Sequence, residues 1–285
     1  MAFSIAALIL TYRYPAGITA LTRFFHEAEI DTYIHVDAKV DAEPFIEAAC
    51  LSTFTNVIFV RDRVEVFWRG FSMIEATMRL LQIAKSHRHY DRFVIVSDDS
   101  IPIVSPQDMR QMLQLAVEYT AAGPAPPEFF ERYRRFFMLD SKTTQVRWIS
   151  DIERVVTTDV LPRLTRLEAL RNKGKKPLVA YFHGSQWMGL TATAVDGILS
   201  SWSSDVWLRE SFEFSEVPDE SYFQTIMAQE VWRPLMYVDW STHLPPRVFK
   251  TIDEISTVDS QGAMFLRKVD LTPDDLDTWL AKIIG

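Results

Sequence analysis

The fold follows from one stretch, Phe93-Val94-Ile95-Val96-Ser97-Asp98-Asp99-Ser100, in which an apolar run ends abruptly in polar and acidic side chains. A short continuous apolar run of this kind is typical of a strand buried on both faces of a parallel sheet. Ligands bind such sheets outside the carboxyl ends of the strands. The stretch therefore predicts a buried strand over 93–96 that ends in acidic residues at a binding edge.

The residues before this stretch repeat the same pattern. Residues 4–10 form a second apolar run, residues 31–36 lead into Asp37, and residues 57–60 are again apolar. Helices are expected between them, over 18–28, 45–51 and 70–86. Strands that alternate with helices indicate an α/β fold with a parallel sheet and crossover helices. Asp37 then lies at the binding edge, and we expect His35, two residues earlier, to be packed within the sheet.

The second half of the chain begins at its strongest break, Ala121-Ala122-Gly123-Pro124-Ala125-Pro126-Pro127. Beyond it, strands are expected over 178–182 and 186–191, helices over 193–200, 222–229 and 272–284, and an exposed basic loop over 171–177. Pro218-Asp219-Glu220 is expected to open the helix over 222–229. Proline is tolerated at the first helical position, and acidic side chains favour the positive end of the helix dipole.

The composition limits the classes of function. Of 285 residues, 48% are hydrophobic, which is enough for a substantial core, and the net charge of −8 argues against a general nucleic-acid binder. Cys50 is the only cysteine, so no disulfide can form within the chain. The apolar run over 3–10 is too short to span a bilayer. We therefore expect a cytoplasmic, bacterial protein without a membrane anchor.

Five sequence blocks follow one another in a fixed order. They are Tyr33-Ile34-His35-Val36-Asp37-Ala38-Lys39, Ser97-Asp98-Asp99-Ser100-Ile101-Pro102, Gly184-Ser185-Gln186-Trp187-Met188-Gly189-Leu190-Thr191, Pro218-Asp219-Glu220 with Ser221-Tyr222-Phe223-Gln224-Thr225-Ile226-Met227, and Phe265-Leu266-Arg267-Lys268-Val269-Asp270. This set resembles the core-2/I-branching β-1,6-N-acetylglucosaminyltransferase family, which also includes the peptide O-xylosyltransferases. The resemblance implies a GT-A-like nucleotide-binding sheet with acceptor-site elements in the second half. We expect a single glycosyltransferase domain over 1–285, with a nucleotide-binding half at 1–120 and an acceptor-binding, catalytic half at 121–285.

The resemblance also implies how the reaction is catalysed. An inverting glycosyl transfer needs a base for the acceptor hydroxyl and a positive charge for the departing diphosphate. Glu220 matches the base of the family, and Lys268 matches a lysine that binds the diphosphate. Arg247 is the best match for the arginine partner of that lysine, with Lys250 as a rival. Asp37 matches a residue that accepts hydrogen bonds from the nucleoside, although an aspartate in a turn is the structural alternative.

Four further residues are candidates for binding sugars. Ser185 and Gln186 carry groups that could hold hydroxyls of the donor or the acceptor. Trp187 offers a wide ring for stacking on a sugar, although a position in the core is an equal alternative. Trp240 matches by position a tryptophan on which acceptors stack. Arg132 lies in a segment rich in arginine and aromatics and is a candidate contact for an acidic acceptor.

No cofactor and no metal are expected. Many GT-A enzymes hold a metal with an Asp-x-Asp motif, and the literal match here is Asp275-Leu276-Asp277. It falls inside the expected C-terminal helix, where residues two apart do not face the same way. Asp98 and Asp99 are adjacent rather than spaced. The resemblance implies a metal-independent enzyme, in which lysine and arginine neutralise the diphosphate instead.

The expected function is a metal-independent, inverting transfer of a sugar, with GlcNAc favoured, from a UDP-sugar to a hydroxyl of a bacterial glycan in β linkage. A β-xylosyltransferase that uses UDP-xylose is the alternative within the enzyme class. A sugar-nucleotide- or glycan-binding module without turnover, and a scaffold for glycan assembly, are the alternatives outside it. The expected partners are the UDP-sugar and the glycan acceptor. A lipid-linked acceptor would bring the protein to the inner face of the membrane.

Overall fold

The computed structural model of the protein describes residues 3–50, 56–134, 137, 140, 181–213, 215–242 and 245–285. Their core is a five-stranded sheet with the strand order β3-β2-β1-β4-β8. Its strands are β1 (Ile5–Thr11), β2 (Asp31–Val36), β3 (Val57–Phe59), β4 (Arg92–Ser97) and β8 (Gly189–Thr191). Strands β1 to β4 are parallel to one another, and β8 is antiparallel to β4. The predicted α/β fold with a parallel-rich sheet and crossover helices is confirmed.

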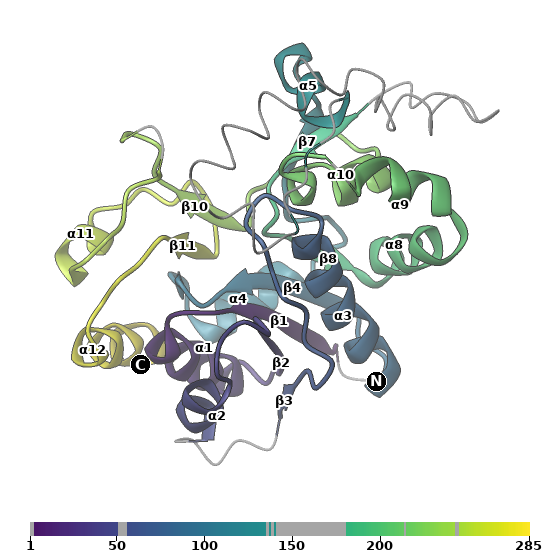
Figure 1. Ribbon diagram of the computed structural model, residues 1–285. Coiled ribbons are helices and arrows are strands. Elements are labelled where there is room, and N and C mark those ends of the chain that lie inside the picture. The colour runs from purple at the N-terminus through teal and green to yellow at the C-terminus, as the bar shows by residue number, and fades with distance from the viewer. Residues whose placement is uncertain are drawn as a thin grey trace.

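Helices cover both faces of this sheet, because its central strands are apolar on both sides. Every residue of β4 is buried, as are all but one of β1. On one face, α1 (Pro15–Glu27) packs beside α2 (Glu43–Cys50), α4 (Pro106–Leu113) and α12 (Pro273–Ile284). On the other, α3 (Ser72–His87) packs against α8 (Ala192–Ser204), as Figure 1 shows.

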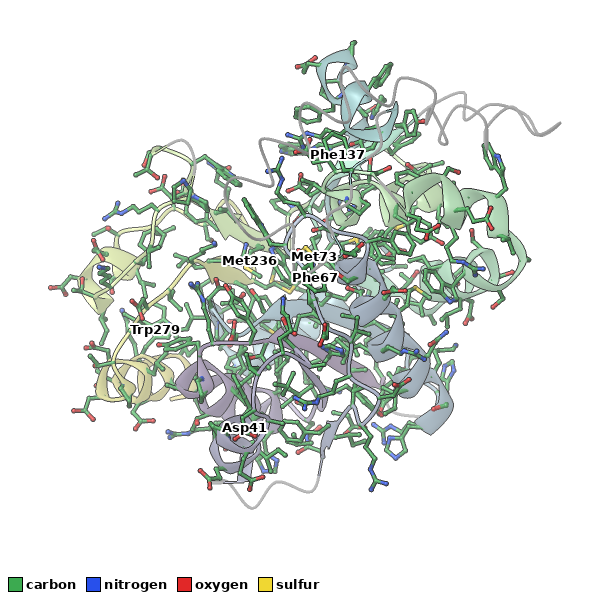
Figure 2. All side chains as sticks on the ribbon, in the orientation of Figure 1. Asp41, Phe67, Met73, Phe137, Met236 and Trp279 are labelled. Atoms are coloured by element: carbon green, nitrogen blue, oxygen red, sulfur yellow. The ribbon has the colours of Figure 1, made fainter. Side chains whose placement is uncertain are left out.

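A second sheet stands at the carboxyl end of β4 and has the order β10-β11-β5. Its strands are β5 (Ser100–Pro102), β10 (Met236–Val238) and β11 (Phe265–Arg267). The indole of Trp279 on α12 (labelled in Figure 2) donates to the carbonyl of Pro102 at 2.8 Å and anchors this sheet. Since β11 is antiparallel to β5, Arg267 lies opposite Ser100, next to the end of β4.

The third sheet has the order β7-β6-β9 and lies beside α10 (Tyr222–Met227), as Figure 1 shows. Its strands are β6 (Ala121–Pro124), β7 (Phe182–Gly184) and β9 (Val231–Trp232). The remaining short helices are η1 (Pro127–Phe129), α5 (Phe130–Arg134), α9 (Val206–Phe212), η3 (Pro218–Glu220), α10 (Tyr222–Met227) and α11 (Ile252–Ser256). Within the described ranges, no helix is both long and apolar enough to cross a membrane.

The prediction for Pro218-Asp219-Glu220 was wrong in one respect. These residues form their own 3-10 turn, η3, and α10 begins only at Tyr222. The turn is separated from α10 because Ser221 has a non-helical backbone, with φ −143° and ψ −33°. Glu220 therefore gains little from the dipole of α10. The expected basic loop over 171–177 lies outside the described residues, as do residues 178–180 of the expected strand.

Candidate active site

Asp98 holds the loop between β1 and α1 at the carboxyl edge of the central sheet. Its Oδ2 atom accepts hydrogen bonds from Thr11 Oγ1 at 2.7 Å and from the backbone N–H groups of Arg13 and Tyr14 at 3.2 and 2.9 Å. Burial raises the pKa of Asp98, while the bond from Thr11 opposes that rise. A Cβ atom at Gly17 would lie 2.0 Å from the carbonyl oxygen of Asp98, so only glycine fits there.

Asp99 is a buried carboxylate that two arginines share. Its Oδ1 atom accepts from Ser97 Oγ at 2.5 Å and from Arg267 Nε at 2.8 Å, and its Oδ2 atom accepts from Arg13 Nη2 at 3.1 Å. Burial alone would raise the pKa of Asp99. The charge of Arg267 and the hydrogen bonds from Ser97 and Arg267 outweigh burial, so the pKa is lowered and Asp99 stays ionised.

Lys268 follows Arg267 and adds a further positive charge at this edge. Its side chain is half-buried, and burial together with the charge of Arg267 lowers its pKa, whereas Asp99 raises it. A lysine in such a place stays a strong cation only while an anion is near. Lys250, the rival of Arg247, is exposed.

Arg247 lies on a segment that runs alongside Lys268. The backbone N–H of Phe249 donates to the carbonyl of Lys268 at 2.8 Å, which brings the two segments together. The guanidinium of Arg247 itself is 2.9 Å from Glu254 Oε1 and 3.7 Å from Asp239 Oδ2. The structure therefore brings the two segments together but leaves the Arg247 side chain engaged by two carboxylates.

Asp37 lies directly after β2, at the same edge of the sheet. Its Oδ1 atom accepts from the backbone N–H groups of Lys39 and Val66 at 2.9 and 3.2 Å, and Lys39 Nζ lies 3.5 Å from Oδ2. His35 is fully buried and accepts from the N–H of Val64 at 2.9 Å, and burial lowers its pKa to about 4. His35 is thus packed within the sheet, and both side chains hold the segment after β3.

Residues 185–187 run between β7 and β8 and pass the second sheet. Ser185 Oγ accepts from the N–H of Trp187 at 3.1 Å, and the carbonyl of Ser185 accepts from Gln224 Nε2 at 2.8 Å. Trp187 is buried, with the guanidinium carbon of Arg267 4.7 Å from its ring centroid. Gln186 is buried too, and its Nε2 atom has no hydrogen-bond partner among the described residues. A buried donor of this kind calls for a water or a ligand oxygen.

Trp240 leaves the second sheet at the same end as Lys268. Strands β10 and β11 are parallel and pair Val238 with Arg267, so the residues that follow each strand emerge together. The Trp240 side chain is 55% exposed, in contrast to Trp187. A large apolar ring left open at the rim of a site is suited to stacking on a sugar.

Glu220 lies in a cluster at the end of β7. Its Oε2 atom is 3.5 Å from Arg132 Nη1 and 3.9 Å from His183 Nε2, and its side chain is 37% exposed. Burial raises the pKa of Glu220, and the charge of Arg132 opposes this rise. Burial and the charge of Arg132 lower the pKa of His183 to about 4, so His183 is neutral near neutral pH. Glu220 therefore has one charged neighbour in this cluster that favours its ionised form.

Asp219 connects this cluster electrostatically to the second sheet. It is fully buried, and burial followed by the charge of Glu220 raises its pKa to about 7, while Arg267 and Arg132 act in the opposite direction. Its Oδ1 atom has no hydrogen-bond partner among the described residues. The charge of Arg267 in the second sheet and that of Arg132 beside Glu220 therefore both act on Asp219.

The Asp-x-Asp match does not form a site. Thr272 caps α12 by accepting from the N–H of Asp275 at 3.2 Å, and Asp277 pairs with Arg23 at 3.2 Å on the surface. In the parts of the chain that the structure describes, no group of three or more His, Cys, Asp or Glu side chains could hold a metal ion.

Three residues of this arrangement were missed by the sequence analysis. Arg267 lay inside a quoted block, but only its neighbour Lys268 was assigned a role. Arg13 lies two residues after the end of β1, and a cation near the carboxyl end of a parallel strand is a signal that could have been used. His183 lies beside Glu220 only because β7 and η3 come together, and nothing in the local sequence indicates this.

No curated protein matches the chain, whereas one family model does. The family model of the core-2/I-branching enzymes matches residues 5–262, which include both the carboxyl edge of the central sheet and the Glu220 cluster. The chain therefore belongs to the core-2/I-branching enzyme family and is a glycosyltransferase of that type.

Proposed function

We propose that the protein transfers a sugar from a UDP-sugar, with GlcNAc favoured, to a hydroxyl of a glycan, with inversion to a β linkage and without a metal ion. One observation carries the proposal. The structure holds a partly exposed carboxylate, Glu220, paired with Arg132 at 3.5 Å, and a set of fixed cations, Arg267 and Lys268, at the carboxyl edge of the central sheet. Asp219, the neighbour of Glu220, is influenced by the charge of Arg267. A base and a set of fixed positive charges are the two things that such a transfer needs.

In this mechanism, Glu220 takes the proton from the acceptor hydroxyl as its oxygen attacks the anomeric carbon of the donor. The new glycosidic C–O bond forms on one face of the sugar while the bond from carbon to the diphosphate oxygen breaks on the other. The configuration therefore inverts, and UDP leaves with the electron pair. Lys268, with Arg247 or Lys250 as its partner, would neutralise the charge that builds up on the diphosphate.

The carboxylates at the edge support a mechanism without a metal. Asp98 accepts three hydrogen bonds from Thr11 and the loop, and Asp99 is shared by Arg13 and Arg267. Carboxylates bound in this way by protein donors are poorly placed to bind a divalent ion. A cation set of Lys and Arg can do the work of such an ion on a diphosphate.

The remaining candidates would bind the rest of the two substrates. Asp37 would accept hydrogen bonds from the nucleoside at the end of β2. The unpartnered donor of Gln186, with the hydroxyl of Ser185, would hold sugar hydroxyls, while buried Trp187 forms the floor beneath Arg267. Trp240 would stack on the acceptor at the rim.

The test is turnover by the Glu220→Gln variant, with Glu230→Gln as a control because Glu230 is exposed and lies ten positions further along the chain. Release of UDP from UDP-GlcNAc is measured over a panel of glycan acceptors. We expect E220Q to lose roughly 10²- to 10⁴-fold in kcat with little change in UDP affinity, and E230Q to be as active as the parent. Equal turnover by E220Q and the parent would refute this role of Glu220.

Two further measurements separate the alternatives. Loss of activity in EDTA that Mn²⁺ restores would contradict the metal-free mechanism. Competition between UDP-GlcNAc and UDP-xylose in thermal-shift assays ranks the two donors. If UDP-sugars bind but neither transfer nor slow hydrolysis occurs with any acceptor, the protein is a binding module instead.

A further inference from the structure

We propose that Arg13 is a third cation for the diphosphate of the sugar nucleotide, acting from the loop between β1 and α1. The inference rests on the proposed function, because it assumes a nucleoside diphosphate as the ligand. Arg13 lies at the junction of β1 and β4, where the strand order of the central sheet changes direction. Phosphates bind parallel sheets at such a junction.

The geometry of Asp99 places Arg13 next to the cations of the second sheet. Asp99 Oδ2 accepts from Arg13 Nη2 at 3.1 Å and from Arg267 Nη2 at 3.4 Å, so one carboxylate oxygen lies between two guanidinium groups. Lys268 follows Arg267 in the chain, directly after β11. Arg13, Arg267 and Lys268 thus converge on one buried acid from two different sheets.

This convergence leaves an excess of positive charge. The positive charges of Arg267 and Arg13 repel the ammonium group of Lys268, whereas the carboxylate of Asp99 attracts it. Asp98 is also near Arg13, but its Oδ2 atom is occupied by Thr11 and by the backbone of the loop. Three cations beside the two carboxylates of Asp98 and Asp99 would still repel one another in the free protein. A diphosphate, with more than one negative charge, relieves that repulsion.

The loop that carries Arg13 is held in place on both sides. Asp98 binds the backbone N–H groups of Arg13 and Tyr14. The hydroxyl of Tyr14 donates to the carbonyl of Leu271 at 2.5 Å and accepts from the N–H of Leu271 at 3.1 Å, three residues after Lys268. The backbone at Arg13 is therefore held close to the segment that follows Lys268, which lowers the entropy lost on binding. The Arg13 side chain is still 46% exposed, so a ligand can reach its guanidinium.

The experiment compares the affinities of the full-length parent, Arg13→Met and Arg13→Lys for UDP, UMP and uridine by titration calorimetry. Arg23→Met is the matched control, because Arg23 lies on α1 and pairs with Asp277 at the surface, away from the edge. We expect R13M to weaken UDP binding about tenfold, R13K to restore part of it, and uridine binding to remain unchanged. R23M should bind UDP as the parent does.

The possible outcomes are distinct. If the parent binds UDP and R13M binds it equally well, Arg13 is not a phosphate contact, although the proposed function stands. If R13M weakens uridine as much as UDP, Arg13 acts on the structure of the loop and the inference is wrong. If the parent binds none of the three ligands, the proposed function fails and the inference fails with it.

Discussion

Arg267 Nε lies 2.8 Å from Asp99 Oδ1, although the two residues are 168 positions apart in the sequence. This pair joins the end of the central sheet to the second sheet, and it fixes the guanidinium above Trp187. Arg13 pairs with the other oxygen of Asp99, and Lys268 follows Arg267 in the chain. The pair is therefore one of the contacts that join residues 1–120 to residues 121–285, together with the hydrogen bond from Trp279 to Pro102.

Replacement of Asp99 by asparagine tests this link. We expect D99N to be less stable by about 1–3 kcal/mol, because the guanidinium groups of Arg13 and Arg267 lose a charged partner in a partly buried place. The folded-state pKa of Asp99 is depressed, so its stabilisation is present above the unfolded-state pKa and is lost as the pH falls through the folded-state pKa. Urea unfolding at several acidic pH values should therefore show a weaker dependence on pH in D99N. An identical dependence in both proteins would contradict the pairing.

Replacement of Arg132 by methionine tests the environment of the base. In the part of the chain that the structure describes, the groups near Glu220 include the cation Arg132, the neutral His183, the buried Asp219 and the hydroxyl of Tyr133. Arg132 is the cation that holds the pKa of Glu220 down against burial, so its loss raises that pKa further. Since the base must be ionised, the acidic limb of the kcat/KM profile should move to higher pH in R132M. Arg132→Lys keeps the charge and should keep the limb near its original position; a limb that stays in place in R132M would exclude this role.

Replacement of Asp219 by asparagine tests a pH dependence of stability that runs in the opposite direction to that of Asp99. Burial raises the pKa of Asp219 from 3.8 to about 7 in the folded protein. Between these values the folded state keeps the proton and the unfolded state loses it, so stability falls as the pH rises. The side chain at position 219 cannot ionise in the D219N variant. The free energy of unfolding of D219N should therefore change less across this pH interval than that of the parent, by a few kcal/mol at most. Chemical unfolding across the same pH range gives the comparison, and parallel curves for D219N and the parent would mean that Asp219 is ionised throughout.

The strands that build the binding edge could be predicted because each is a local pattern. An apolar run such as 93–96 must be buried whatever its neighbours are, and the polar residue that ends it must come to the edge of the sheet. Asp37 and Asp98 could be placed in this way. The position of Lys268 at the same edge could be expected only from the resemblance to the family.

The parts that could not be predicted depend on contacts between distant segments. The pairing of Asp99 with Arg267 requires β5 and β11 to meet, and the position of His183 beside Glu220 requires β7 to meet η3. The error at Glu220 has a local origin. Pro218 with two acids has the composition of a helix start, but Val217 adopts a left-handed backbone with φ 51°, and Ser221 interrupts the helix before Tyr222. Neither conformation is evident from residue type, since valine is disfavoured in the left-handed region.

A glycine substitution tests whether the loop that carries Arg13 depends on Asp98. In Gly17→Ala the new methyl group would meet the carbonyl oxygen of Asp98 at 2.0 Å, which is backbone and cannot turn aside. We expect a loss of about 1–3 kcal/mol in stability, together with weaker UDP binding because the loop must shift. Gly197→Ala is the matched control. Gly197 is helical like Gly17, but it is exposed, and a Cβ atom there meets nothing within 4 Å. That variant should be more stable by up to about 1 kcal/mol, because alanine favours the helix over glycine. Thermal unfolding of the two variants with and without UDP gives both quantities. If G17A were as stable as G197A, the close packing of α1 against Asp98 would be wrong, and the fixed position of Arg13 would lose its basis.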